Sequence, residues 1–149
     1  CWAAGLGLFV ACGNDSGGFN AEIRTSPDGI TWTQRYTAAN PPALNGVATN
    51  AAGTTVVAAG TSGFLLSSTN GTSWTSRTSG TTKDLRGIAY DGGMWVAVGD
   101  SGTILTSTNG TSWTSRTSGT SYNLGGVAYG DGMWVAVGSD GTIIGTVPT

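Results

Sequence analysis

The sequence predicts an all-β protein, a β-propeller built from four-stranded antiparallel blades of about 39–42 residues each. Three observations support this fold class. A unit of 39 residues recurs along the chain, each unit divides into four short β-type runs, and Gly, Asn and Asp residues separate the runs. Helical periodicity is absent throughout the sequence. Four antiparallel strands in about 40 residues is the usual pattern of one propeller blade.

The repeat is clearest in the second half of the 149-residue chain. Residues 87–113 match the segment that starts at Gly126, so that Trp95 and Trp134 correspond at an offset of 39 residues. Residues 61–80 recur at the same offset and include the identical run STNGTSWTSRTSG. We therefore expect one β-propeller domain, or part of one, over residues 1–149, with repeats at 1–45, 46–86 and 87–125 and an incomplete repeat at 126–149.

Each repeat divides into four runs, which we expect to be the strands of one blade. The second run of the third copy, residues 94–98, is apolar at every position, which indicates a strand with both faces covered by neighbouring blades. The last run is more polar and is expected at the rim. Before it, Asn109-Gly110 is the dipeptide favoured in type I′ hairpins, because both residues tolerate positive φ. In this copy the expected strands cover residues 87–90, 94–98, 103–107 and 112–117.

Three turns between the third and fourth runs share one pattern, in which Ser, Asp or Asn, Gly and Trp recur at fixed spacing. The pattern resembles the Asp-box, or bacterial neuraminidase repeat, of sialidases, photosystem II assembly-factor-type propellers and phage or bacterial surface proteins. It is degenerate here, because each copy is one residue shorter than the family pattern and two copies have Asn instead of Asp. Its residues are Ser26, Asp28, Gly29 and Trp32, then Ser68, Asn70, Gly71 and Trp74, then Ser107, Asn109, Gly110 and Trp113.

These turn residues are expected to be structural. An Asp or Asn side chain can accept hydrogen bonds from backbone N–H groups two residues further on, and the Gly that follows can take a positive φ. The Trp is then expected to cover the turn. The resemblance implies that the turn lies at the outer edge of the blade, and it does not specify a function.

The composition argues against several classes of function. Six basic and eight acidic side chains give a net charge of −2, and the basic residues form no cluster. We therefore expect neither a nucleic-acid partner nor a membrane partner. The sequence contains no histidine, which excludes Ser-His and Cys-His catalytic groups and histidine-based zinc sites. We expect no metal, no cofactor and no catalytic residue.

A sialidase comparison, which the resemblance invites, also favours a non-enzymatic protein. Sialidases use three arginines that converge on the substrate carboxylate, a Tyr–Glu pair as the nucleophile and an Asp as the acid. Here Arg77 and Arg116 occupy equivalent rim positions on different blades, and Glu22 is the only glutamate. We expect a binding or structural module that recognises a glycan or a partner protein. The alternative is a fragment of a sialidase-like glycoside hydrolase propeller that lacks its catalytic residues.

Candidate binding residues follow the rim strands. Lys83 and Asp84 correspond by the repeat to Tyr122 and Asn123, and Tyr36 follows the rim run of the diverged first copy. Equivalent grooves between the blades would present the same groups more than once, so that weak contacts gain avidity. The longer loop at residues 14–20 is a further candidate, because variable loops on rigid scaffolds tend to carry function. The competing interpretation is that these are ordinary solvated loop residues.

The two cysteines, Cys1 and Cys12, correspond in repeat register to Gly87 and Val98. Those two positions are expected to face each other across a hairpin, so the sequence allows a disulfide between Cys1 and Cys12. The alternative is that Cys12 is a small buried residue and Cys1 a frayed end.

The number of repeats also bears on how the blades could complete a ring. An open arc of blades would expose apolar faces, which soluble monomers rarely tolerate. We expect identical chains to complete the ring, with a four-blade closed ring or a longer parent propeller as the alternatives. The polar, uncharged, Thr-rich composition favours an extracellular or virion location, as in a phage tail or bacterial surface protein.

Overall fold

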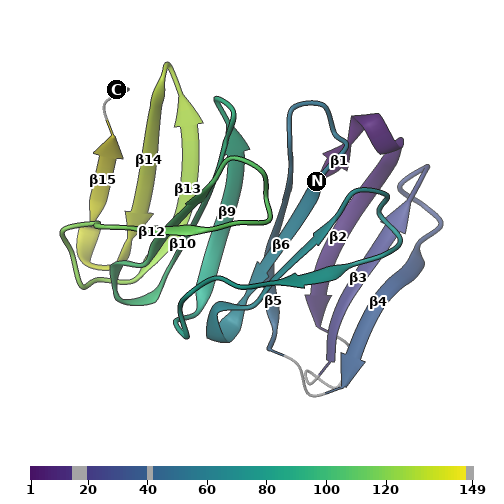
Figure 1. Cartoon of the computed structure of the whole chain (residues 1–149), viewed down its shortest axis with the longest axis horizontal. Coiled ribbons are helices and arrows are strands. Elements are labelled where there is room, and N and C mark those ends of the chain that lie inside the picture. Colours follow the sequence, from purple (N-terminus) through teal and green to yellow (C-terminus); the bar gives the residue numbers. More distant parts are fainter. Residues whose placement is uncertain (15–19, 40–41, 147–149) are drawn as a thin grey trace.

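The computed structural model describes residues 1–14, 20–39 and 42–146, and these form four antiparallel sheets that stand side by side in an open arc (Figure 1). We name the sheets blades 1 to 4. Blade 1 contains β1 (Trp2–Ala3), β2 (Leu8–Asn14), β3 (Asn20–Ser26) and β4 (Thr33–Ala39), and blade 2 contains β5 (Leu44–Thr49), β6 (Val56–Gly60), β7 (Leu65–Ser68) and β8 (Thr75–Arg77). Blade 3 contains β9 (Leu85–Asp91), β10 (Met94–Gly99), β11 (Ile104–Ser107) and β12 (Thr114–Arg116), and blade 4 contains β13 (Leu124–Gly130), β14 (Met133–Gly138) and β15 (Ile143–Thr146).

Each blade is a meander, because its strands are hydrogen-bonded in the order in which they occur in the chain. Short 3₁₀ turns η1 (Ala4–Leu6), η2 (Thr61–Gly63), η3 (Asp100–Gly102) and η4 (Ser139–Gly141) supply the little helical structure of the described residues. The predicted all-β propeller architecture is therefore confirmed, in the form of a partial propeller with one incomplete blade. Blades 2 to 4 begin at Leu44, Leu85 and Leu124, each two residues before the repeat boundary taken from the sequence.

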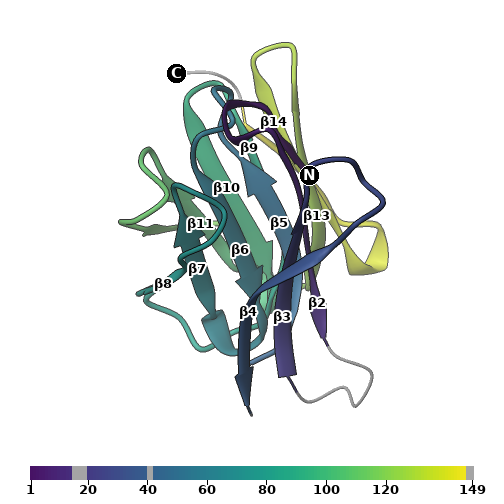
Figure 2. The same ribbon diagram turned by 90° about the vertical axis from the view of Figure 1, so that its right-hand side faces the viewer.

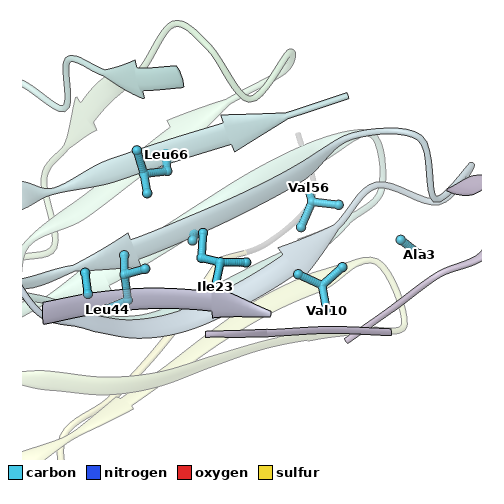
Figure 3. Packing of buried hydrophobic residues seen from close by; sticks show 8 residues of the cluster. Ala3, Val10, Ile23, Leu44, Val56 and Leu66 are labelled. Carbon is cyan, nitrogen blue, oxygen red and sulfur yellow. The ribbon is translucent and has the colours of Figure 1, made fainter. Parts of the chain in front are cut away.

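The core lies between the blades and consists of three apolar clusters. Between blades 1 and 2, Val10 and Ile23 pack with Leu44, Val56 and Leu66 (Figure 3). The other two clusters lie between blades 2 and 3 and between blades 3 and 4. They share β10, whose residues alternate between Trp95 and Ala97 toward blade 2 and Val96 and Val98 toward blade 4. This strand is covered on both faces, as its unbroken apolar run predicts.

Glycines allow the first strands of successive blades to approach closely. A Cβ atom at Gly87 of β9 would lie 3.2 Å from the carbonyl oxygen of Gly125 and 3.3 Å from the Cα of Gly126, both on β13. Contacts this short are tighter than a Cβ atom ordinarily makes, so a side chain at Gly87 would have to push the backbone of β13 aside. On the blade 2 side, Asn45 donates a hydrogen bond from Nδ2 to the carbonyl oxygen of Leu85 at 2.8 Å. The inner edge of the arc is thus held by backbone packing and by a bond between blades.

The turns between the third and fourth strands differ from the expected type I′ hairpin. Only the glycines have positive φ, at 72° for both Gly71 and Gly110, and Asn70 and Asn109 do not. The reason is a side-chain bond pattern that repeats in all three turns. In the third, Asn109 Oδ1 accepts hydrogen bonds from the N–H groups of Thr111 and Ser112, each at 2.9 Å, and Ser107 Oγ accepts from Gly110 N–H at 2.9 Å. These bonds stabilise a wider loop than a two-residue hairpin.

The disulfide that the sequence allows between Cys1 and Cys12 is not formed in this structure, where both thiols are free. The backbone of Cys1 instead exchanges two hydrogen bonds of 2.8 Å with that of Val10. In blade 3 the corresponding hairpin turns within two residues, but in blade 1 η1 lengthens the loop and shifts the register by two residues. Cys12 packs against the core between blades 1 and 2, where burial raises the pKa of its thiol to about 11.

Candidate functional site

Two link segments, residues 78–84 and 117–123, join one blade to the next and have the same internal hydrogen bonds. Thr81 N–H donates to Ser79 Oγ at 3.3 Å, and Lys83 N–H donates to Thr81 Oγ1 at 3.1 Å. The second link repeats these bonds, from Thr120 N–H to Ser118 Oγ at 3.3 Å and from Tyr122 N–H to Thr120 Oγ1 at 3.2 Å. Local bonds of this kind fix the backbone without help from strands.

The fixed backbone places Lys83 and Tyr122 at equivalent positions, and both side chains are exposed. Lys83 lies beside a surface hollow of about 590 Å³, which is formed by its own link and by η2. No carboxylate in the part of the chain described here lies within ion-pair distance of Lys83. Lys83 and Tyr122 are therefore the two predicted residues whose side chains are most available to a ligand.

Asp84 and Asn123 have a structural contact that the sequence did not reveal. Asp84 Oδ1 accepts a hydrogen bond of 2.8 Å from the N–H of Ser62, in η2 of the preceding blade. Asn123 Oδ1 accepts the equivalent bond of 2.9 Å from Ser101, in η3. Ser62 and Ser101 have φ values of 54° and 55°, in the left-handed region that non-glycine residues seldom adopt. Each side chain thus fastens the turn of one blade to the start of the next.

Tyr36 does not lie with the other four candidates. It is on β4 opposite Ile23 and packs against the core between blades 1 and 2. Burial raises the pKa of its phenol. The other candidate in this blade, the loop at residues 14–20, falls largely outside the described residues.

A charged pair lies on the inner side of blade 3. Arg86 donates two hydrogen bonds to the carboxylate of Asp100, of which the one from Nη2 to Oδ2 measures 3.1 Å. These bonds lower the pKa of Asp100 and raise that of Arg86. Arg86 also lines a second hollow, of about 430 Å³, with Asn123, Gly126 and Val137. This hollow lies at the inner edge of blade 4, next to its uncovered face.

The rim arginines bond to their own blades. Arg35, Arg77 and Arg116 each donate a hydrogen bond from Nε to a hydroxyl group on the adjacent third strand. The partners are Thr25 at 2.9 Å, Ser67 at 2.7 Å and Thr106 at 2.9 Å, in each case ten residues earlier in the chain. This bond was not predicted from the sequence, although a hydroxyl residue stands ten positions before each rim arginine and could have indicated it.

Within residues 1–14, 20–39 and 42–146, no group of three or more Cys, Asp or Glu side chains is placed to hold a metal ion. No helix within the same ranges is long and apolar enough to span a membrane.

The four meander sheets define the fold of the described residues as a partial β-propeller. The chain is similar to YCF48 from Cyanidioschyzon merolae, with a TM-score of 0.66 and 16% identity, over 94% of this chain and 50% of that one. A structure of YCF48 bound to D1 peptide has a TM-score of 0.60 and 16% identity, over 86% and 43%. The chain therefore spans about half the length of these proteins, and the likeness shows the fold alone.

No protein-family model and no curated relative matches the sequence. The Asp-box assignment accordingly stays a resemblance, although the three turns share one hydrogen-bonding pattern.

Proposed function

We propose that this chain is a non-enzymatic binding module that recognises a segment of a partner protein. The observation that carries the proposal is the repeated link segment, which holds Lys83 and Tyr122 at equivalent exposed positions on two blades. A ligand that contacts both links would gain affinity from two weak sites at a fixed separation. The links are held by their own hydrogen bonds, so little conformational entropy would be lost on binding.

A peptide is the favoured ligand for two reasons. One solved propeller with this fold is bound to a peptide. In addition, the hollow beside Lys83 is lined mainly by Ser, Thr and Gly residues of the link, whose hydroxyl and backbone groups suit hydrogen bonding to an extended chain.

Glycan recognition is the second candidate. It is favoured by the side chain of Tyr122, which is 48% exposed and adjacent to Asn123, since aromatic rings and amide groups suit the apolar faces and hydroxyls of sugars.

A catalytic role has less support. The three rim arginines bond within separate blades, and Arg24 bonds to Glu22, so these groups are engaged before any substrate arrives. This arrangement weighs against the alternative of a sialidase-like glycoside hydrolase fragment. An extracellular or virion location is part of the proposal, and its support is the polar, uncharged and Thr-rich composition, with a charged fraction of 9%.

The test is selection of ligands by the immobilised full chain, from a display library of random peptides and from a glycan array. We expect selected peptides to bind the unaltered chain and to lose at least ~10-fold in affinity with Lys83→Ala or Tyr122→Ala. Thr72→Ala, at an exposed position in a blade 2 turn, is the matched control and should bind normally. Selective binding of sugars alone would favour the glycan candidate, and turnover of a sialoside would overturn the proposal.

A further inference from the structure

The face of blade 4 that points away from blade 3 is apolar and uncovered. Among its residues, Val137 is 47% exposed and Ile143 is 73% exposed. The same positions in blades 2 and 3 are covered by the next blade. Val135, Val137 and Ile143 form this face of blade 4. The repeat aligns them with Val96, Val98 and Ile104 of blade 3, and with Val57, Ala59 and Leu65 of blade 2.

The chain itself shows what covers such a face. Blade 2 is covered by Trp95, Ala97 and Leu105 of blade 3. Blade 3 is covered in the same way by Trp134, Ala136 and Ile144 of blade 4. The face that covers such a surface therefore consists of an aromatic residue and an alanine on the second strand of a blade and a branched aliphatic residue on the third.

The face of blade 1 that points away from blade 2 lies at the opposite end of the arc and has most of this pattern (Figure 2 looks at this end). Phe9 pairs with Ser26 as Trp95 pairs with Ser107, and Ala11 pairs with Arg24 as Ala97 pairs with Leu105. Phe9 is 38% exposed, and its ring lies 4.6 Å from that of Trp2, which is also exposed. Blade 1 thus presents Phe9, Ala11 and Arg24 where a covering blade presents Trp, Ala and Leu.

We propose that two copies of this chain associate head to tail, with blade 4 of one copy packed against blade 1 of the other, and so close a single ring. The two-fold arrangement forms the same interface twice and leaves no apolar face uncovered. This chain is similar over 94% of its length to 50% of a solved propeller, so two copies together have about the length of that protein. Two copies contribute eight sheets, within the roughly four to eight blades of ordinary propellers.

Two features of blade 4 fit a following blade. Asp140, with φ of 53°, corresponds to Ser62 and Ser101, whose N–H groups bond to the next blade, and the described residues provide no acceptor for its own N–H. At the inner edge, a Cβ atom on Gly126 would meet only Val137 of the same sheet, at 3.5 Å, so there is space for another strand.

Arg24 is the one departure from the repeat pattern. Its guanidinium forms an ion pair of 2.7 Å with Glu22, which also accepts a hydrogen bond of 2.8 Å from Gln34. The charge is therefore already partnered before association. The aliphatic part of the side chain can cover Ile143 of the second copy while the charged end stays at the rim.

The test is the mass of the whole chain in solution, measured by light scattering over a range of concentrations. The expected value is twice the chain mass of 14.9 kDa. Ile143→Glu on the tail face and Ala11→Glu on the head face should each weaken association at least ~10-fold, because each buries an unpaired charge. Both positions are exposed in the single chain, and circular dichroism checks that the variants fold. Thr72→Glu, outside both faces, is the control.

Mixing the two variants gives the decisive result. A head-to-tail dimer predicts that the mixture recovers association, since one intact interface remains between an Ile143→Glu chain and an Ala11→Glu chain. If Ala11→Glu alone leaves the dimer intact, two tail faces pair with each other and the proposal is overturned. A single-chain mass for the unaltered protein at all concentrations also overturns it. Should either glutamate variant misfold, Ile143→Ser and Ala11→Ser apply the same test.

Discussion

At the scale of single residues, small polar side chains determine the turns of this protein. A Ser and an Asp or Asn, two positions apart, accept four hydrogen bonds from backbone N–H groups in each turn between third and fourth strands. Both Asp and Asn can fill this role, because the bonds need an acceptor oxygen. The chain uses Asp28 in blade 1 and Asn70 and Asn109 in blades 2 and 3.

Asp28 makes the stability of the chain depend on pH. The N–H groups of Thr31 and Ile30 and the hydroxyl of Ser26 lower the pKa of its carboxyl to about 2, from an ordinary value of 3.8. A lowered pKa in the folded state gives stability that is present above the unfolded value and is lost as the pH falls toward 2. We expect Asp28→Asn to fold as the other two turns do, and to lose less in melting temperature between pH 4 and pH 2 than the unaltered chain. Equal losses in both proteins would contradict this account.

The cysteines should react as two separate thiols. Cys1 is exposed, whereas Cys12 is partly buried and has a pKa of about 11. At pH 8 only ~0.1% of Cys12 is thiolate, so it should react much more slowly with a thiol reagent than Cys1. Titration without reductant is expected to find two thiols in the unfolded chain, and finding none would restore the disulfide.

At the scale of the elements, each blade combines a cross-strand bond at its rim with close backbone contact at its inner edge. The arginine of the fourth strand bonds to a hydroxyl of the third in all three complete blades. Glycines at the inner edge bring successive first strands together. The rim bond therefore stabilises a single sheet, whereas the inner contact holds different sheets together.

The rim bond can be measured by a double-mutant cycle. Arg116→Ala and Thr106→Val each remove the same hydrogen bond, and each should lower the free energy of unfolding by about 1 kcal/mol. The double variant should cost less than the two single variants added together, because the bond can be lost only once. Denaturant titration provides all four values, and strict additivity would mean that the two side chains do not interact.

The inner-edge contact is tested by two matched glycines. Gly87→Ala places a methyl group against the backbone of β13 and should destabilise the chain by roughly 1–3 kcal/mol. Gly126→Ala occupies the equivalent position in blade 4, where only Val137 is near, and should be tolerated in the single chain. Denaturant titration in the Ile143→Glu background compares them without association, and equal destabilisation would contradict the packing described.

Much of this fold could be predicted from the sequence. Strands such as β10 are bounded by glycine turns and are apolar throughout, so their limits were correct within one or two residues. The repeat also indicated that Lys83 and Tyr122 occupy equivalent positions. The contact of Asp84 could not be predicted, because its partner Ser62 lies 22 residues away in another blade. The position of Cys1 was missed because one short helical turn changes a strand register.

At the scale of the whole molecule, the blades are not independent domains. Each blade buries its apolar residues only against a neighbour, so the two end faces of the arc are incomplete interfaces. Blade 4 presents an apolar face, and blade 1 presents a face of aromatic residues with one partnered arginine. The proposed ring follows from this complementarity.

One substitution should strengthen the ring. Arg24→Leu restores the residue type found at this position in blades 2 and 3, Leu66 and Leu105. It adds apolar contact with Ile143 of the second copy and removes the need to bring a charge toward the interface. We expect the dimer to dissociate at lower concentrations than the unaltered protein, as measured by sedimentation. Weaker association would indicate that Arg24 contributes a specific contact.

Small-angle X-ray scattering of the whole chain tests most directly whether these repeats are blades of one ring. A ring of two copies predicts the scattering of a compact disc with twice the mass of the chain. An elongated particle, or a lone arc that keeps its end faces in solvent, would contradict it.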